Sequence, residues 1–434
     1  MPATPQGPPV KARAAVAALF FTNGFVFSNV VPRYPEIKAD LALSNAALGT
    51  AIAAMPLGAL LVGLAAGPLI ARFGSAWTAV VSQVLMGVDV VLVGTAPSYT
   101  LLWAAVFTAG SLDAVTDVAM NAHGMRVQRR YGRSILNSFH GVWSIGAVLG
   151  GLAGAAAAGA GVPLPVHLCG AGVFAAVSAT AGRRFLLPGP EDAERDPASS
   201  GGAPGDASEA GRVRFRRPVV TAFAVLGLLT AAAAVVEDSP ASWGATYLQN
   251  ELGTGAFVGG FAFIALQGTQ TVGRLLGDRV VHRTGERTTA RLGGLLVAFG
   301  MGTALTWPTV PTTVAGFALA GFGIATLIPA AFRAADEVPG LPPGTGITVA
   351  AFLLRLGFLA SPPVIGIVAD ATSIRTGLVL VPAAGAVILL TSGILGGARG
   401  SSPAAESHGD AADGAPSGGT ARPASRPVAA RDES

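Results

Sequence analysis

Twelve long apolar stretches, six on each side of one polar segment, constrain the fold of this chain more than any other feature. A helix rises about 1.5 Å per residue and the hydrocarbon core of a bilayer is about 30 Å thick, so about 20 apolar residues cross it. The stretches of this length lie approximately at residues 12–31, 46–70, 77–96, 100–122, 134–158, 164–182, 218–240, 256–277, 288–307, 312–334, 346–369 and 376–397. We therefore predict an all-α membrane protein with twelve transmembrane helices in two pseudo-symmetric six-helix halves.

The composition agrees with a membrane protein and argues against other classes. The chain is 51% hydrophobic and 12% charged, whereas ordinary soluble domains are roughly 25% charged. Its formal net charge of +4 arises in polar loops, and no basic stripe with interleaved aromatic residues occurs, so we expect no nucleic-acid partner. Cys169 is the only cysteine, which excludes an intrachain disulfide and a multi-cysteine metal site.

Polar segments divide the chain into five regions. We expect a cytoplasmic N-terminal tail at 1–11, a first six-helix half at 12–182, a flexible cytoplasmic linker at 183–217, a second half at 218–397 and a disordered cytoplasmic tail at 398–434. The linker and the C-terminal tail are rich in Pro, Gly, Ser and acidic residues, which is typical of unstructured segments. We expect neither of them to carry chemistry.

The distribution of basic residues predicts the orientation. If the N-terminus is cytoplasmic, the outward connections carry only Arg33, Lys38 and Arg375. The inward connections then carry Arg72, the cluster Arg126, Arg129, Arg130 and Arg133, and Arg212, Arg214, Arg216 and Arg217. Because cytoplasmic loops are enriched in basic residues, both termini are expected in the cytoplasm. The excess of Ala, Gly and Arg suggests a GC-rich bacterial genome and hence a bacterial inner membrane.

A repeated turn supports the two-half organisation. The second apolar stretch ends in Gly63-x-x-x-Gly67 and the eighth ends in Gly273-x-x-x-Gly277, and Arg-x-Gly follows each of them. Small residues four apart let two helices approach closely. Either copy alone is compatible with an ordinary positive-inside turn, but two copies at matching places predict a duplication.

The first copy resembles the loop signature of the major facilitator superfamily, Gly-x-x-x-Asp-Arg-x-Gly-Arg-Arg. It matches at Gly67, Arg72 and Gly74, whereas Ala71 stands at the position of the Asp. The resemblance implies a transporter that works as a monomer, without a cofactor or a metal, and contacts a small-molecule substrate and the lipid bilayer.

The second copy matches the same signature at Arg283, Gly285 and Arg287. His282 takes the position of the Asp, and Asp278 lies four residues earlier. The resemblance therefore implies that an inner-gate ion pair comes from the second copy.

Other segments resemble a narrower subgroup, the sugar-permease-like facilitators similar to fucose permease, whose substrates are largely unassigned. The matching segments are residues 32–38, 117–122, 138–146, 243–248 and 357–363. The subgroup usually has an acid directly before the tryptophan of the fourth segment, where this chain has Ser242-Trp243, with Glu237-Asp238 further upstream.

Polar side chains inside the apolar stretches are costly and mark candidate sites. Asp113, Asp117 and Asn121 recur every four residues and share one face of a helix, and His140 lies at a similar depth in the next stretch. A carboxylate beside an imidazole can relay protons, because imidazole titrates near neutral pH. The alternative for His140 and Asn121 is a structural hydrogen bond between helices, whereas for Asp113 we favour a function.

Two further charged residues are candidates in the second half. Glu237 becomes the outer counterpart of Asp113 if its helix continues to Tyr247, as the resemblance implies, and is otherwise exposed at the interface. Arg355 lies near the midplane and needs an acid or an anionic ligand. It either anchors the substrate or pairs with Asp89, Asp113 or Glu237.

Several polar side chains complete the candidate set. Asp89 is isolated on a helix that is peripheral in the related fold, where we expect a snorkelling or a paired structural role. Hydrogen-bonding groups that line the same cavity are expected from Asn23, Asn29, Gln267 and Gln270.

These features favour a secondary active transporter that moves a small solute by alternating access, driven by protons or another coupling ion. A drug or metabolite exporter of the same fold is the alternative. No Gly-x-x-x-x-Gly-Lys-Ser/Thr loop occurs, so nucleotide hydrolysis does not supply the driving force. A membrane enzyme is disfavoured because His-Glu-x-x-His and Gly-x-Ser-x-Gly are absent, and a receptor is disfavoured because no substantial soluble domain is present.

Overall fold

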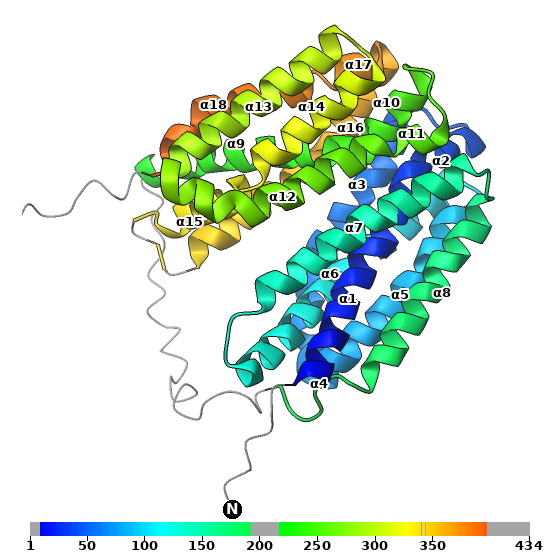
Figure 1. Ribbon diagram of the computed structural model, residues 1–434, viewed down its shortest axis with the longest axis vertical. Helices are drawn as coiled ribbons and strands as arrows, with labels where there is room; N and C mark the ends of the chain where they lie inside the picture. The colour runs from blue at the N-terminus through cyan, green and yellow to red at the C-terminus, as the bar shows by residue number, and fades with distance from the viewer. Residues whose placement is uncertain (1–8, 192–216, 340, 343, 397–434) are drawn as a thin grey trace, which may run out of the picture. The chain divides into compact units, whose positions relative to one another are not determined.

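The computed structural model describes residues 9–191, 217–339, 341–342 and 344–396. The ends of the chain, residues 1–8 and 397–434, and most of the expected linker, residues 192–216, lie outside these ranges. The expectations of tails and a flexible linker there remain predictions. Within the described residues the chain forms helices and no β-strand, as Figure 1 shows.

The first half consists of six spans, four of which are single helices. They are built from α1 (Val10–Val30), η1 (Val31–Arg33), α2 (Tyr34–Asp40), α3 (Asn45–Val62), η2 (Gly63–Ala65), α4 (Ala66–Phe73), α5 (Ser75–Thr95), α6 (Tyr99–Tyr131), α7 (Leu136–Gly159) and α8 (Leu164–Arg183).

The second half repeats this plan with more interruptions. It is built from α9 (Arg217–Ser239), the π-helical turn η5 (Pro240–Gly244), α10 (Ala245–Asn250), α11 (Ala256–Gly259), α12 (Phe261–Thr284), α13 (Glu286–Thr306), α14 (Val310–Ile324), α15 (Leu327–Asp336), α16 (Thr345–Ala371), α17 (Ile374–Gly377), α18 (Leu380–Thr391) and η6 (Ser392–Ile394).

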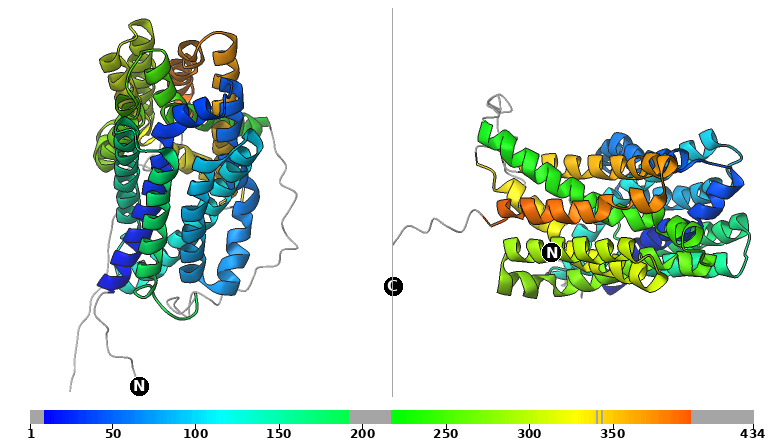
Figure 2. Two further views of the ribbon diagram at one scale, coloured as in Figure 1. Left: turned by 90° about the vertical axis from the view of Figure 1, so that its right-hand side faces the viewer. Right: turned by 90° about the horizontal axis from the view of Figure 1, so that it is seen from above.

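The predicted twelve-helix architecture is confirmed. Ten helical segments of the described chain are long and apolar enough to cross a membrane. Helices α12 and α13, with 24 and 21 residues, complete the set. The helices of each half run side by side in the views of Figures 1 and 2.

Glycine ends a span at the same place in both halves. Gly74 has φ 81° between α4 and α5, and Gly285 has φ 79° between α12 and α13. Residues with a Cβ rarely adopt this backbone conformation, so glycine permits the sharp turn. The two copies of the loop signature identified in the sequence thus form the same turn.

Small residues bring helices into backbone contact within the first half. Gly146, Gly150 and Gly154 recur every four residues along α7 and face α1. A Cβ on Gly146 would lie 2.2 Å from the carbonyl oxygen of Phe21, so no larger residue fits. This close approach fixes the relative position of the polar side chains that α1 and α7 carry.

The two halves meet at the helix ends opposite the arginine-rich turns. Asp370, at the end of α16, accepts hydrogen bonds of 2.8 Å from the backbone N–H groups of Asn45 and Ala46 at the start of α3. Four residues into α3, Gly49 lies against the backbone of Pro362 in α16. Nearby, α7 contacts α11 and α12, and α2 contacts α10. At the opposite ends, α4 and α15 pack against elements of their own half.

Candidate functional site

A hydrogen-bonded group joins three helices of the first half. The Nδ2 of Asn23 in α1 donates to the Oδ1 of Asp113 in α6 at 2.8 Å. The indole N–H of Trp143 in α7 donates to the Oδ1 of Asn23 at 2.7 Å. Asn23 is buried and the other two residues are partly buried. One oxygen of Asp113 is thus held in place by a neutral donor.

A second group lies one to two helical turns along α6. The Nδ2 of Asn121 donates to the Oδ1 of Asp117 at 2.9 Å, and the Oδ1 of Asn121 lies 3.2 Å from the Nε2 of His140. Asn121 therefore stands between the acid and the imidazole instead of the two meeting directly. Asp117 and His140 are exposed, and the His140 ring meets the edge of Phe20 at 5.2 Å between centroids.

Glu237 carries the corresponding acid of the second half. Its helix continues beyond Ser239 to Asn250. The continuation passes through a π-helical turn that begins at Pro240, because this residue lacks the N–H that a regular α-helix uses. Glu237 is therefore inside a long span, as the resemblance implied. The Nη2 of Arg274 in α12 lies 3.5 Å from its Oε1. Sequence reasoning missed Arg274, which stands one turn after Gln270.

Among the described residues, Arg355 forms no ion pair with Asp89, Asp113 or Glu237, the three acids considered from the sequence. Arg355 also forms no hydrogen bond and no other ion pair within the described part of the chain. Two of the acids considered as its partners have other neighbours: Asp113 is hydrogen-bonded to Asn23, and Glu237 lies beside Arg274. Its guanidinium is exposed on α16 and attracts the carboxylate of Asp117, on α6 of the other half.

A second charge also acts across the two halves. Arg274 of α12 exerts an electrostatic effect on His140 of α7. The polar side chains of α6 and α7 thus lie within electrostatic reach of the cationic side chains of α12 and α16. We call the following residues the central polar cluster: Asn23, Asp113, Asp117, Asn121, His140, Glu237, Arg274 and Arg355.

The remaining predicted amides take two different positions. Gln267 and Gln270 of α12 are buried, and within the described chain the Nε2 of each has no hydrogen-bond partner. Asn29 instead binds the Nε2 of His167 at 2.8 Å and the carbonyl oxygen of Phe25. It therefore joins α1 to α8, away from the central polar cluster.

The first copy of the loop signature acquires its missing carboxylate from the linker. Glu191 accepts hydrogen bonds from the backbone N–H and the hydroxyl of Ser75, at 2.7 and 3.0 Å, and lies 3.2 Å from the Nη1 of Arg126. It caps the start of α5, which follows Gly74. Glu191 belongs to the segment 183–217 that we expect to be a linker, and its contacts here are structural. Arg72 stacks on the ring of Phe73, 5.4 Å from its centroid.

Gly67 of the first copy lies in α4. No atom lies within 4 Å of the position that a Cβ would take there, so no other helix approaches closely at Gly67.

The second copy forms its ion pair with a residue that the sequence did not single out. The Oε1 of Glu286, directly after Gly285, lies 2.9 Å from the Nε of Arg333 in α15. Arg287 donates to the carbonyl oxygen of Gly393. In the described residues, Asp278 and Arg283 are exposed and form no ion pair.

Three comparisons place these features among known proteins. A family model described as Major Facilitator Superfamily matches residues 16–340. The "Uncharacterized transporter y4wD" of Sinorhizobium fredii is 29% identical over 383 residues, which cover 88% of this chain and 97% of that protein. The solved structure of the nucleoside transporter NupG is similar with a TM-score of 0.69 at 12% identity, covering 88% of this chain and 98% of that one. A D-xylose-proton symporter has a TM-score of 0.67 at 16% identity, covering 88% and 96%.

Proposed function

Because the chain belongs to the major facilitator superfamily and is a membrane transporter, we propose that it is a monomeric secondary active transporter driven by protons. It moves a small solute across the bacterial inner membrane by alternating access, with both termini in the cytoplasm. The central polar cluster is its pathway for solute and protons.

The observation that carries this proposal is that the cluster's charges face each other across the two halves. Asp117 and His140 come from the first half, and Arg355 and Arg274 come from the second. A solute held between them contacts both halves at once, so a change in the contact between the halves alters its surroundings. Arg355 supports binding of a solute with an anionic group, because its planar fork suits a carboxylate or a phosphate.

The contacts between the halves favour one state of the cycle. Asp370 joins α16 to the start of α3, and α7 contacts α11 and α12, all at the ends opposite the arginine-rich turns. With those turns in the cytoplasm, these contacts close the outer side. The chain as described thus corresponds to a state that is closed outside, in which the solute reaches the cluster from the cytoplasm.

Asp113 and Glu237 are the residues proposed to carry the coupling proton. Each is a partly buried acid inside a span, one in each half, next to the residues proposed to hold the solute. Glu237 lies 3.5 Å from the guanidinium of Arg274, and Asp113 accepts a hydrogen bond from the neutral Asn23.

Uptake into proteoliposomes tests the proposal. The purified protein is reconstituted and offered a panel of labelled sugars, sugar acids, amino sugars and drugs, with and without an imposed pH gradient. We expect one class of solute to accumulate above its equilibrium level only with the gradient. Equilibration at equal rates with and without the gradient contradicts proton coupling, and the absence of any protein-dependent flux contradicts transport of these solute classes.

A further inference from the structure

Asp89 is a buried carboxylate without a partner in the described part of the protein. Its residue surface is 3% exposed, and neither carboxylate oxygen has a hydrogen-bond partner there. This differs from the paired or snorkelling role expected from the sequence. A charge removed from water without a counter-charge costs several kcal/mol or more. A cationic ligand beside Asp89 would supply the missing counter-charge.

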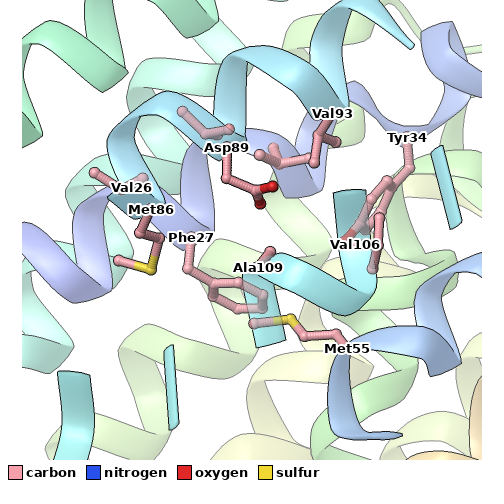
Figure 3. A pocket seen from close by; sticks show the side chains of 11 residues that line it. Val26, Phe27, Tyr34, Met55, Met86, Asp89, Val93, Val106 and Ala109 are labelled. Atoms are coloured by element: carbon pink, nitrogen blue, oxygen red, sulfur yellow. The ribbon is translucent and has the colours of Figure 1, made fainter. Parts of the chain in front are cut away.

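A cavity lies directly in front of this carboxylate. It is lined by residues of α1, α2, α3, α5 and α6 of the first half, and Figure 3 shows the carboxylate of Asp89 pointing into it. The centres of water-sized spheres can occupy about 40 Å³ of the cavity. Since one water needs about 10–15 Å³ by this measure, the cavity holds a ligand of a few heavy atoms.

Apart from Asp89, the walls of the cavity are almost entirely apolar. Besides Asp89, they consist of the aromatic rings of Phe27 and Tyr34, the thioether side chains of Met55 and Met86, and aliphatic side chains. Hard metal cations bind through several oxygen ligands, typically six or more for Ca²⁺. Among the described residues, the lining offers the Asp89 carboxylate and one phenol, and no group of three potential metal ligands occurs.

We propose that this cavity binds a small organic ammonium ion, with its nitrogen at Asp89 and its apolar body between the aromatic and thioether side chains. The carboxylate supplies the counter-charge, the ring faces attract a cation, and the methionine side chains adapt to the shape of an alkyl group. An uncharged ligand leaves Asp89 without a counter-charge, and an inorganic cation leaves the apolar walls without a partner.

The cavity is separate from the central polar cluster but adjoins it. Phe27 lies four residues after Asn23 on α1, and Ala109 lies four residues before Asp113 on α6. Four residues correspond to about 6 Å along a helix. The ammonium site therefore lies about one helical turn toward the outer side from the Asn23–Asp113 hydrogen bond. Its existence does not depend on the solute or the coupling ion proposed above.

Isothermal titration calorimetry of the purified full-length protein in detergent tests this site, with n-butylammonium as the probe. Asp89→Asn preserves the shape of the side chain and removes its charge. Ala109→Leu keeps Asp89 and fills the cavity. Asp40→Asn, at an exposed acid at the end of α2 and outside the central polar cluster, is the matched control.

We expect saturable binding of one n-butylammonium to the wild-type protein and to Asp40→Asn. Asp89→Asn and Ala109→Leu should weaken it by about tenfold or more, which corresponds to the loss of one charge interaction or of the space for the ligand. The uncharged probe 1-butanol and sodium ions should give no heat that depends on Asp89. Size-exclusion profiles and melting temperatures verify that each variant is folded.

Three results would overturn the proposal. The first is equal n-butylammonium binding by the wild-type protein and Asp89→Asn. The second is an Asp89-dependent heat with sodium or with 1-butanol that matches the heat with n-butylammonium. The third is the absence of saturable n-butylammonium binding to the folded wild-type protein, in which case Asp89 is stabilised by a proton or by water alone.

Discussion

The Oε1 of Glu191 lies 3.2 Å from the Nη1 of Arg126, so the beginning of the linker is tied to the C-terminal part of α6. Glu191 also caps α5 through Ser75. In the second half, Glu286 at the start of α13 pairs with Arg333 of α15. Each half thus joins a carboxylate at the start of one helix to an arginine near the C-terminal end of the next span. The first half borrows its carboxylate from the linker, because Ala71 stands where the family signature has Asp.

Glu191→Gln should lower the melting temperature of the detergent-solubilised protein by a few degrees. The substitution keeps the size of the side chain but removes the charge that pairs with the buried guanidinium of Arg126. Hydrogen bonds to charged groups contribute about 1.5–3 kcal/mol, and the partial exposure of Glu191 reduces this value. Differential scanning fluorimetry measures the change.

Glu337→Gln is the matched control for this measurement. Glu337 is an exposed acid at the end of α15, and the same substitution there should leave the melting temperature unchanged. If Glu191→Gln is as stable as this control, the contact of Glu191 with α5 and α6 does not stabilise the first half.

Asp370→Asn should weaken the closure of the outer side. The carboxylate accepts two hydrogen bonds at the start of α3, where the helix dipole also favours negative charge. Asparagine keeps one acceptor oxygen but loses the charge, which at a helix N-terminus is worth about 0.3–1 kcal/mol and corresponds to a roughly two- to fivefold shift between two states. The change is measured by electron paramagnetic resonance distances between spin labels at Pro97 and Thr372.

This experiment needs a background without the native cysteine, because Cys169 is exposed. Asp40→Asn, at an exposed acid on the same side, is the control. We expect a population with a longer distance between the labels in Asp370→Asn and none in Asp40→Asn. Identical distance distributions in both variants would show that Asp370 does not hold the halves together.

Arg355→Lys should weaken solute binding by about tenfold, and Arg355→Gln should nearly abolish it. Lysine keeps the charge but loses the two parallel hydrogen bonds of the guanidinium. Glutamine loses the charge as well as these two hydrogen bonds. Because Arg355 forms no ion pair in the described residues, we expect neither variant to lower the melting temperature. Binding is measured with the solute that the uptake panel identifies.

The opposite pattern would assign Arg355 a structural role. A stable Arg355→Gln protein with unchanged solute affinity is incompatible with anchoring. A large loss of melting temperature indicates instead that the guanidinium balances Asp117, the acid that it attracts across the two halves.

The sequence predicted the architecture because the length and apolarity of a transmembrane helix are local properties. The twelve stretches, the two six-helix halves and the matching turns at Gly74 and Gly285 all follow from residues close together in the chain. The spacing of Asp113, Asp117 and Asn121 also placed them correctly on one face of α6, since helical periodicity is local as well.

Contacts between distant residues were not predictable in the same way. Glu191 pairs with Arg126, 65 residues away, from a segment whose composition resembles a linker. Arg274 of α12 lies beside Glu237 of α9, 37 residues away in the chain. The sequence predicted Asp89 on a peripheral helix and not beside a cavity. The cavity is not predictable from neighbouring residues, because it is formed by the packing of five helices or helical segments.

Proton-driven accumulation compared with exchange tests the central proposal most directly. Asp113→Asn and Glu237→Gln each remove one acid proposed to carry the proton while keeping the size of the side chain. In proteoliposomes, the account predicts that both variants lose accumulation of the solute driven by a pH gradient but retain counterflow exchange, because binding and alternating access persist. Normal gradient-driven accumulation by both variants would contradict proton coupling through Asp113 and Glu237.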